Sequence, residues 1–189
     1  YIDREKAILA KYDENLNLVQ EYTGDYEIII APNKMISGDV YAYVQQNPEN
    51  SDDYSIAIHN FSNGDTNLIN WEKDTSTGLG ENPHILELLH LNNSRTLLIY
   101  DYSEGDQYES GFYNLYGILI DPETGSLLGE EVQLTNLIGK ENIEFASVTD
   151  NGGFQILYGA EDSIRNNENT NYIDREKAIL AKYDENLNL

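Results

Sequence analysis

Two acidic turns carry the residue types best suited to holding a metal ion. Asp121–Gly125 (DPETG) places two carboxylates in one turn, and a second group of acids lies within residues 101–106. Oxygen atoms from carboxylates are the ligands that calcium prefers. Neither segment has the spacing of the calcium loop with its distant glutamate. Asp121 and Glu123 are therefore candidate calcium ligands, the alternative is an ordinary acidic turn, and no other cofactor is expected.

Tyrosines beside the second acidic segment form a candidate ligand-binding surface. Tyr102, Tyr108 and Tyr113 are interspersed with acidic residues between positions 101 and 113. Aromatic faces can stack on sugar rings, while carboxylates accept hydrogen bonds from sugar hydroxyls. These three tyrosines are candidate glycan contacts, with an exposed polar loop as the alternative.

The sequence lacks the usual patterns of catalytic sites. His59, His84 and His90 form no HExxH motif and the chain has no cysteine, so a zinc site is not expected. Neither a Gly-x-Ser-x-Gly elbow nor a glycine-rich phosphate loop is present. Among 34 acidic residues, a neighbouring pair of carboxylates arises by chance and does not indicate glycoside hydrolysis. The sequence predicts a protein that is not an enzyme.

The charge balance excludes one class of partner. The chain has 34 acidic and 11 basic residues, a net charge of −23. Nucleic-acid phosphates require lysine and arginine, so no nucleic-acid partner is expected. No apolar run reaches the length of a spanning helix, so we expect no membrane insertion by this segment. Abundant acidic surface without cysteine is compatible with an extracellular or cell-surface location.

A long exact repeat dominates the organisation of the chain. Residues 1–18 and 172–189 are identical, so position 172 repeats position 1. The identity predicts 171-residue tandem units, and a duplicated tag is the alternative explanation. A shorter period lies inside the unit, because Tyr43, Tyr100 and Tyr158 each end a similar apolar run and recur at nearly even spacing. Gly117–Leu128 also aligns without gaps to Ala178–Leu189.

Each sub-repeat of about 57 residues contains short runs typical of strands. Asn151-Gly152, between two apolar runs, is a strong hairpin signal because both residues tolerate positive φ. The segment 3–12 is rich in helix formers, but its alignment with a strand pair predicts a strand. In the best-defined sub-repeats the strands are expected at 84–91, 95–102, 113–121, 131–136, 143–149 and 154–159.

These features predict an all-β, β-propeller-like fold with antiparallel four-stranded blades, three per 171-residue tandem unit. Residues 1–24 are expected to be the second half of a blade that continues a preceding repeat unit. Residues 25–80 and 81–139 are expected to form one blade each. Residues 140–189 are expected to form a blade completed by the repeated segment 172–189. Because three blades turn only part of a circle, two units, or two chains, are expected to combine into a six-bladed ring.

Two hairpin motifs resemble the blade repeats of large secreted, adhesin-like surface proteins of bacteria. One motif is carried by Asn151–Phe154 (NGGF). The other is carried by Gly117, Asp121, Gly125, Gly129 and Glu131. Tyrosine replaces the tryptophan that often ends the first hairpin, and residues 26–77 depart most from the pattern. The resemblance implies the propeller-type fold and says almost nothing about activity.

Two functions of different classes follow from these observations. The first is a structural or adhesive repeat module of a long extracellular bacterial surface protein or filament. In that case its partners are neighbouring repeat units or copies of itself, joined head to tail by strand pairing between units. The alternative is a propeller domain that binds surface glycans or peptides.

Overall fold

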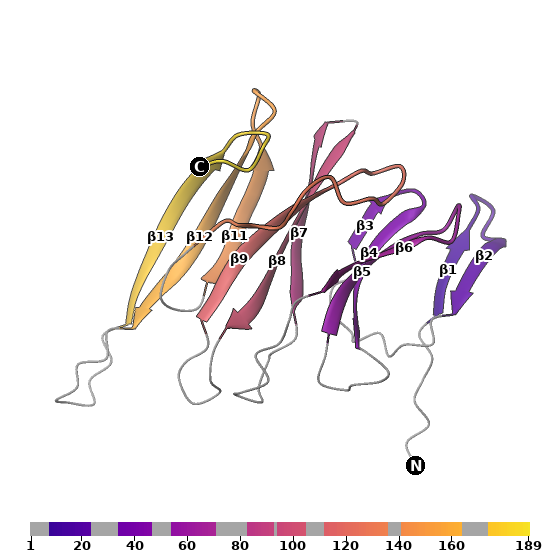
Figure 1. Cartoon of the computed structure of the whole chain (residues 1–189), viewed down its shortest axis with the longest axis horizontal. Helices are drawn as coiled ribbons and strands as arrows, with labels where there is room; N and C mark the ends of the chain where they lie inside the picture. The colour runs from indigo at the N-terminus through magenta and orange to yellow at the C-terminus, as the bar shows by residue number, and fades with distance from the viewer. Residues whose placement is uncertain are drawn as a thin grey trace, which may run out of the picture.

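The computed structural model of the chain is all-β, with antiparallel pairing throughout the described strands (Figure 1). It describes residues 8–23, 34–46, 54–70, 83–92, 94–104, 112–135, 141–163 and 174–189. These residues include strands and turns but no α-helix. The predicted all-β class is confirmed. The segment rich in helix formers is also a strand, because its second copy, Asp174–Tyr183, pairs along its whole length with Phe154–Ser163.

The strands form four sheets in which each strand pairs with its neighbours along the chain. A two-stranded sheet contains β1 (Ile8–Tyr12) and β2 (Leu18–Thr23). The next sheet contains β3 (Lys34–Ser37), β4 (Val40–Gln46), β5 (Tyr54–Asn60) and β6 (Thr66–Asn70). The third contains β7 (His84–Asn92), β8 (Arg95–Glu104), β9 (Phe112–Ile120) and β10 (Val132–Gln133). The last contains β11 (Glu141–Val148), β12 (Phe154–Ser163) and β13 (Asp174–Tyr183).

The hairpin between β11 and β12 follows from its glycines. Gly152 has φ +83°, which a side chain would disfavour, and its N–H donates to the carbonyl of Thr149 at 3.0 Å. Gly153 has no room for a side chain, since a Cβ there would lie 2.2 Å from the carbonyl oxygen of Tyr183. The predicted hairpin signal is therefore confirmed, and Gly153 also allows the hairpin to approach the end of β13.

The first strand of each larger sheet carries an irregularity in its pairing with the second. The register shifts between Met35 and Ser37, between Ile85 and Glu87, and between Ile143 and Phe145. Such β-bulges increase the local twist of a strand pair. The three sheets thus share a structural detail as well as a strand order.

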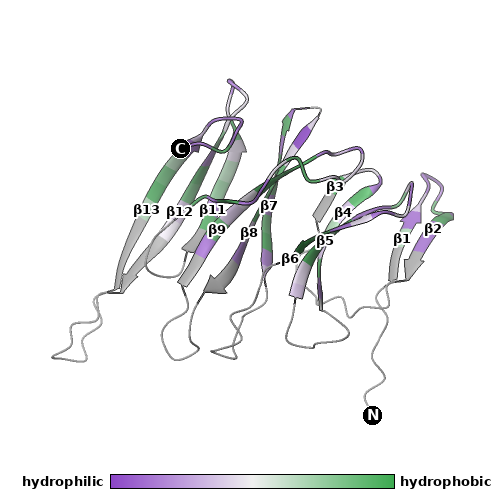
Figure 2. Cartoon of the chain, viewed as in Figure 1, coloured by the Kyte–Doolittle hydropathy of each residue, from purple (hydrophilic) through white to green (hydrophobic). Residues whose placement is uncertain are grey.

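The sheets stand face to face in chain order, with β1–β2 at one end of the row and β11–β13 at the other (Figure 1). Two apolar cores lie between them, and the hydrophobic colouring of the strands follows these cores (Figure 2). In β8 alternate residues serve opposite cores. Leu98 and Tyr100 face the β3–β6 sheet, whereas Leu97 and Ile99 face the β11–β13 sheet. This alternation is what a strand buried on both faces requires.

The three recurrent tyrosines occupy equivalent places. Tyr43, Tyr100 and Tyr158 lie on β4, β8 and β12, the second strand of each sheet, and all are buried. The hydroxyl of Tyr100 donates to the carboxylate of Glu131. All three tyrosines therefore belong to the buried core.

Two details of the sequence interpretation are wrong. Of the strand expected at 131–136, the described residues 131–135 form only Val132–Gln133. Beyond it the Thr135 hydroxyl, and not a main-chain carbonyl, accepts the N–H of Leu115 at 2.9 Å. In the strand before the turn, the gapless alignment is also displaced by two residues. It sets Asp121 beside Lys182, whereas in the structure Asp121 and Asp184 each begin the turn after the third strand. An even displacement preserves which side chains face the core, so the apolar pattern concealed it.

Candidate functional site

Asp121 and Glu123 lie in the turn after β9, where the carboxylate of Asp121 holds the backbone. Its Oδ1 accepts the N–H groups of Glu123 at 2.8 Å and Thr124 at 3.1 Å. The Glu123 side chain is exposed. No group of three or more His, Cys, Asp or Glu residues suited to a metal occurs among the residues that the structure describes. The calcium interpretation of Asp121 and Glu123 stays a prediction, and the observed role of Asp121 is to shape the turn.

The structure describes the three candidate tyrosines only in part. Tyr102 lies on β8 opposite Asn114, and Tyr113 lies on β9 opposite Ser103, so the two tyrosines belong to adjacent strands. Tyr108 lies outside the described residues, as do the side chains of Tyr102 and Tyr113. The glycan-binding interpretation of the three therefore stays a prediction.

The histidines are each held by a neighbouring strand. His59 Nδ1 lies 2.9 Å from the hydroxyl oxygen of Thr66, and His90 Nδ1 is at the same distance from that of Thr96. His84 Nδ1 lies 2.9 Å from Oδ1 of the buried Asp101. His59 is itself buried, and this burial lowers its pKa. These contacts are cross-strand pairs that stabilise sheets.

The turn that contains Asp121 also joins two sheets. The Asn60 side-chain amide donates to the carbonyls of Glu123 at 3.0 Å and Thr124 at 3.1 Å. Asn67 donates to the carbonyl of Gly125 at 3.0 Å. Gly125 has φ +77°, and a Cβ there would lie 3.2 Å from Ile58 and Val40. The turn of one sheet therefore fits closely against the preceding sheet, and hydrogen bonds to the main chain fix its position.

The turn after β13 also contacts the β7–β10 sheet, because the Arg95 guanidinium donates to the carbonyl of Glu185 at 3.4 Å. Oδ1 of Asp184 accepts the N–H groups of Asn186 at 2.8 Å and Asn188 at 2.9 Å. The side chain of Asn188, followed by these N–H groups, lowers the pKa of Asp184. Tyr183, the last residue of β13, donates its hydroxyl to the carbonyl of Leu134. The second copy of the repeated segment is thus fastened to the sheet that precedes it.

The first copy of the same segment has the same turn but a different neighbour. Oδ1 of Asp13 accepts N–H groups from Asn15 and Asn17, as Asp184 does in the second copy. Here Lys11 forms an ion pair with Asp39, in the turn between β3 and β4. Gln20, which is opposite Lys11 on β2, donates to the carbonyl of Phe61 at 2.6 Å. The first copy is thus fastened to the sheet that follows it.

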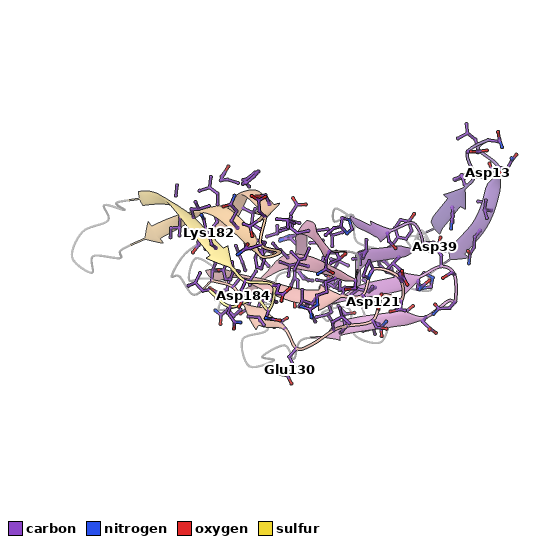
Figure 3. All side chains as sticks on the ribbon, turned by 90° about the horizontal axis from the view of Figure 1, so that it is seen from above. Asp13, Asp39, Asp121, Glu130, Lys182 and Asp184 are labelled. Carbon is purple, nitrogen blue, oxygen red and sulfur yellow. The ribbon has the colours of Figure 1, made fainter. Side chains whose placement is uncertain are left out.

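The two copies therefore bury opposite faces. Lys11 meets Asp39, while its counterpart Lys182 is exposed. Tyr183 is buried, while its counterpart Tyr12 is exposed. Lys182 and Asp13 lie toward opposite ends of the molecule (Figure 3). Each copy makes one half of the contacts that a sheet with neighbours on both sides would make.

The outward face of the β11–β13 sheet carries an exposed apolar row, which we call the terminal face. Phe145, Leu157 and Leu180 lie opposite one another across β11, β12 and β13. Phe145 is 51% exposed and Leu180 is 55% exposed. Lys182 lies on the same face beside Gln155, whose side chain donates to the hydroxyl of Ser147 at 3.1 Å. An apolar row with a polar border is typical of an interaction surface.

Sequence reasoning did not single out the terminal face. The sequence signal for this face is that the strands at 143–149 and 154–159 carry apolar residues on both of their sides. This pattern indicates that both faces of the sheet are covered, but it does not identify the neighbour that covers each face. Lys11–Asp39 was missed because an ion pair between separate sheets leaves no local pattern.

Comparison with known protein families, curated proteins and solved structures found no match to the chain. The resemblance to adhesin-like blade repeats therefore stays a prediction. Among the described residues, no helix has the length and apolar character needed to cross a membrane.

Proposed function

We propose that this chain is a structural repeat module. Its sheets stack in a β-propeller-like arrangement, and the stack continues from one 171-residue unit to the next. Its setting is a long extracellular, adhesin-like surface protein or filament of bacteria. Units join head to tail through strand pairing, and the partners are neighbouring units or copies of the chain.

The complementary burial of the two identical segments carries this proposal. β1 is attached to the sheet after it, through Lys11 and Asp39, and β13 to the sheet before it, through Tyr183 and Leu134. A segment with both sets of contacts would be an interior strand of a continuous stack. Stacks of this kind gain stability from each added neighbour, as repeat proteins generally do.

The packing of the first strands supports the propeller-like part of the proposal. β7 packs against β3 and β4, and β11 packs against β7 and β9. First strands that lie close together on one side are what a radial arrangement of sheets requires, with each sheet as a blade. Two units would supply six blades, within the range of about four to eight in closed propellers.

Charge supports a structural role at a surface exposed to water. A net charge of −23 keeps long chains soluble and separate from one another except at matched surfaces. A propeller domain that binds glycans or peptides is the alternative function, with Tyr102, Tyr108 and Tyr113 as candidate glycan contacts. A glycan array separates glycan binding from a structural role. We expect no selective binding; selective binding that substitution of Tyr102 and Tyr113 removes would favour the alternative.

A tandem chain tests the structural role directly. Residues 1–171 followed by residues 1–189 contain an internal copy of the repeated segment, with sheets on both sides. We expect one cooperative unfolding transition at a higher denaturant concentration than for the single chain, because both faces of the internal copy are covered. Two independent transitions at the single-chain midpoint would contradict the proposal. Electron micrographs of the tandem chain test the propeller-like part, for which we expect a closed ring rather than an extended row.

A further inference from the structure

We infer that β13 of one copy of this chain takes the place of β1 in a second copy, so that the two share one four-stranded sheet. The inference rests on the proposed function and names the partner of the terminal face: the β2 strand and the β3–β6 sheet of another copy. The shared sheet would have the order β11-β12-β13 from one copy, followed by β2 from the other.

Sequence identity makes this exchange possible. Residues 8–12, which form β1, are identical to residues 179–183 at the end of β13. β2 pairs with β1 in a defined register, from Ile8 opposite Thr23 to Tyr12 opposite Leu18. Every side-chain and main-chain group of β1 that β2 recognises is therefore also present on β13. Among the described strands β13 lies at the end of the order β11-β12-β13, and β2 is the strand that follows the identical segment along the chain.

The exchange buries apolar surface that each copy exposes by itself. Leu18 and its pairing partner Tyr12 are 52% and 57% exposed. In the shared sheet Leu18 takes the place of the exposed Leu189, its counterpart in the first copy, and lies opposite Tyr183, which is buried against the β7–β10 sheet. Burial of apolar surface is the principal favourable term in association. The exchange also places Phe145 and Leu157 of the terminal face next to the second copy's β3–β6 sheet. These contacts are additional to those that β1 makes with that sheet.

One ion pair orients the two copies. Lys11 contacts Asp39 within the chain. Lys182 is its direct counterpart on β13, so in the shared sheet Lys182 meets Asp39 of the second copy. Gln20 remains on the carbonyl of Phe61, because β2 keeps its place beside its own β3–β6 sheet. β1 of the second copy and Leu189 of the first copy are displaced. The contact runs in one direction, which produces a ring if it closes and a fibre if it does not.

Two matched substitutions in the full chain test the exchange, because we expect them to change the dissociation constant in opposite directions. Lys182→Glu and Lys11→Glu make the same change of charge in identical local sequences. Lys182→Glu repels Asp39 in the shared sheet and leaves the separate chain intact. Lys11→Glu repels Asp39 in the separate chain and leaves the shared sheet intact. Sedimentation velocity over a range of concentrations measures the dissociation constant. We expect Lys182→Glu to raise it about fivefold and Lys11→Glu to lower it by a similar factor.

Charge reversal and cross-linking complete the test. Asp39→Lys combined with Lys182→Glu should restore association, since the pair is reversed only in the shared sheet. Because the chain has no cysteine, a mixture of Lys182→Cys and Asp39→Cys chains should be joined by a short bismaleimide. A mixture of Glu123→Cys and Asp39→Cys chains should not.

Three results would overturn the inference. They are a parent chain that stays monomeric at every concentration, equal effects of the two lysine substitutions, and no selective cross-link. The tandem-chain experiment is independent of these results, because its units are joined covalently. A cooperative tandem chain with no association between separate chains would refute the exchange and leave the structural proposal standing.

Discussion

Tyr12 and Tyr183 hold the same position in two identical segments, yet Tyr12 is 57% exposed and Tyr183 only 6%. Tyr183 stacks on Phe154 with ring centroids 4.7 Å apart and an interplanar angle of 7°. The difference lies in the neighbours, because β13 has β12 beside it, with Phe154, and the β7–β10 sheet on the side where Tyr12 meets solvent. Identical sequence thus supplies matched controls at every position of the repeat.

The first prediction uses this pair. Tyr183→Ala removes a stacked, buried ring and leaves a cavity, which we expect to cost about 3 kcal/mol or more of the free energy of unfolding. Tyr12→Ala removes an exposed ring, so its effect should stay within about 0.5 kcal/mol. Urea unfolding followed by circular dichroism measures both. Similar losses in the two variants would contradict the burial described for these segments.

The second prediction concerns two leucines in the left-handed region of backbone conformation. Leu16 has φ 63° and Leu187 has φ 66°, values that cost a side chain about 1 kcal/mol or more. Leu16 is exposed, so Leu16→Gly relieves strain at little cost and should change stability by less than about 1 kcal/mol. Leu187 is buried in the core, so Leu187→Gly should be destabilising by about 2 kcal/mol or more. Thermal unfolding of both variants gives the comparison, and a more harmful change at Leu16 would show the assignment of faces to be wrong.

The third prediction concerns pH. Burial lowers the pKa of His59 below that of an exposed histidine, about 6.5. As the pH falls through that value, the unfolded chain binds a proton before the folded chain does, and stability is lost. We expect the stability of the parent chain relative to His59→Gln to decrease between about pH 7 and pH 5. Unfolding of both chains across this range tests it, and the two remaining histidines are common to both. A pH-independent difference would mean that His59 does not titrate differently on folding.

The fourth prediction concerns metal removal. Asp121 already accepts two backbone N–H groups, so we expect a chelator to leave the melting temperature unchanged. If Asp121 and Glu123 bound calcium in the folded state, its removal would lower the melting temperature by several degrees, through the linkage between binding and folding. A reversible rise on adding calcium, absent in Asp121→Asn, would establish the site.

Local patterns predicted the strands and failed at the contacts between sheets. Runs of β-branched and aromatic residues, with Asn151-Gly152 between two of them, identify strands because pairing here is between sequence neighbours. The turn carbonyls of Glu123 and Thr124 bind Asn60, which lies far earlier in the chain, and no spacing rule anticipates such a pair.

The candidate site shows the same limit. Asp121 has the residue type of a calcium ligand, but its hydrogen bonds show a residue that shapes a turn. The terminal face escaped notice because Phe145 and Leu180 look like any other strand residue in sequence. Their exposure depends on what lies beside the sheet, which is a property of the assembly and not of the segment.

The neighbour-to-neighbour pairing of the strands has a consequence for how such a gene can change length. Every strand in the described sheets bonds with the strand before or after it, so no sheet depends on a distant part of the chain. If the chain is one unit of the tandem array that we propose, an in-frame duplication or loss of 171 residues would add or remove whole sheets, wherever the recombination break falls. Exact copies such as residues 1–18 and 172–189 favour further exchange of this kind. In the tandem arrangement that we propose, the number of units can therefore change without a change in the strand pairing inside any sheet.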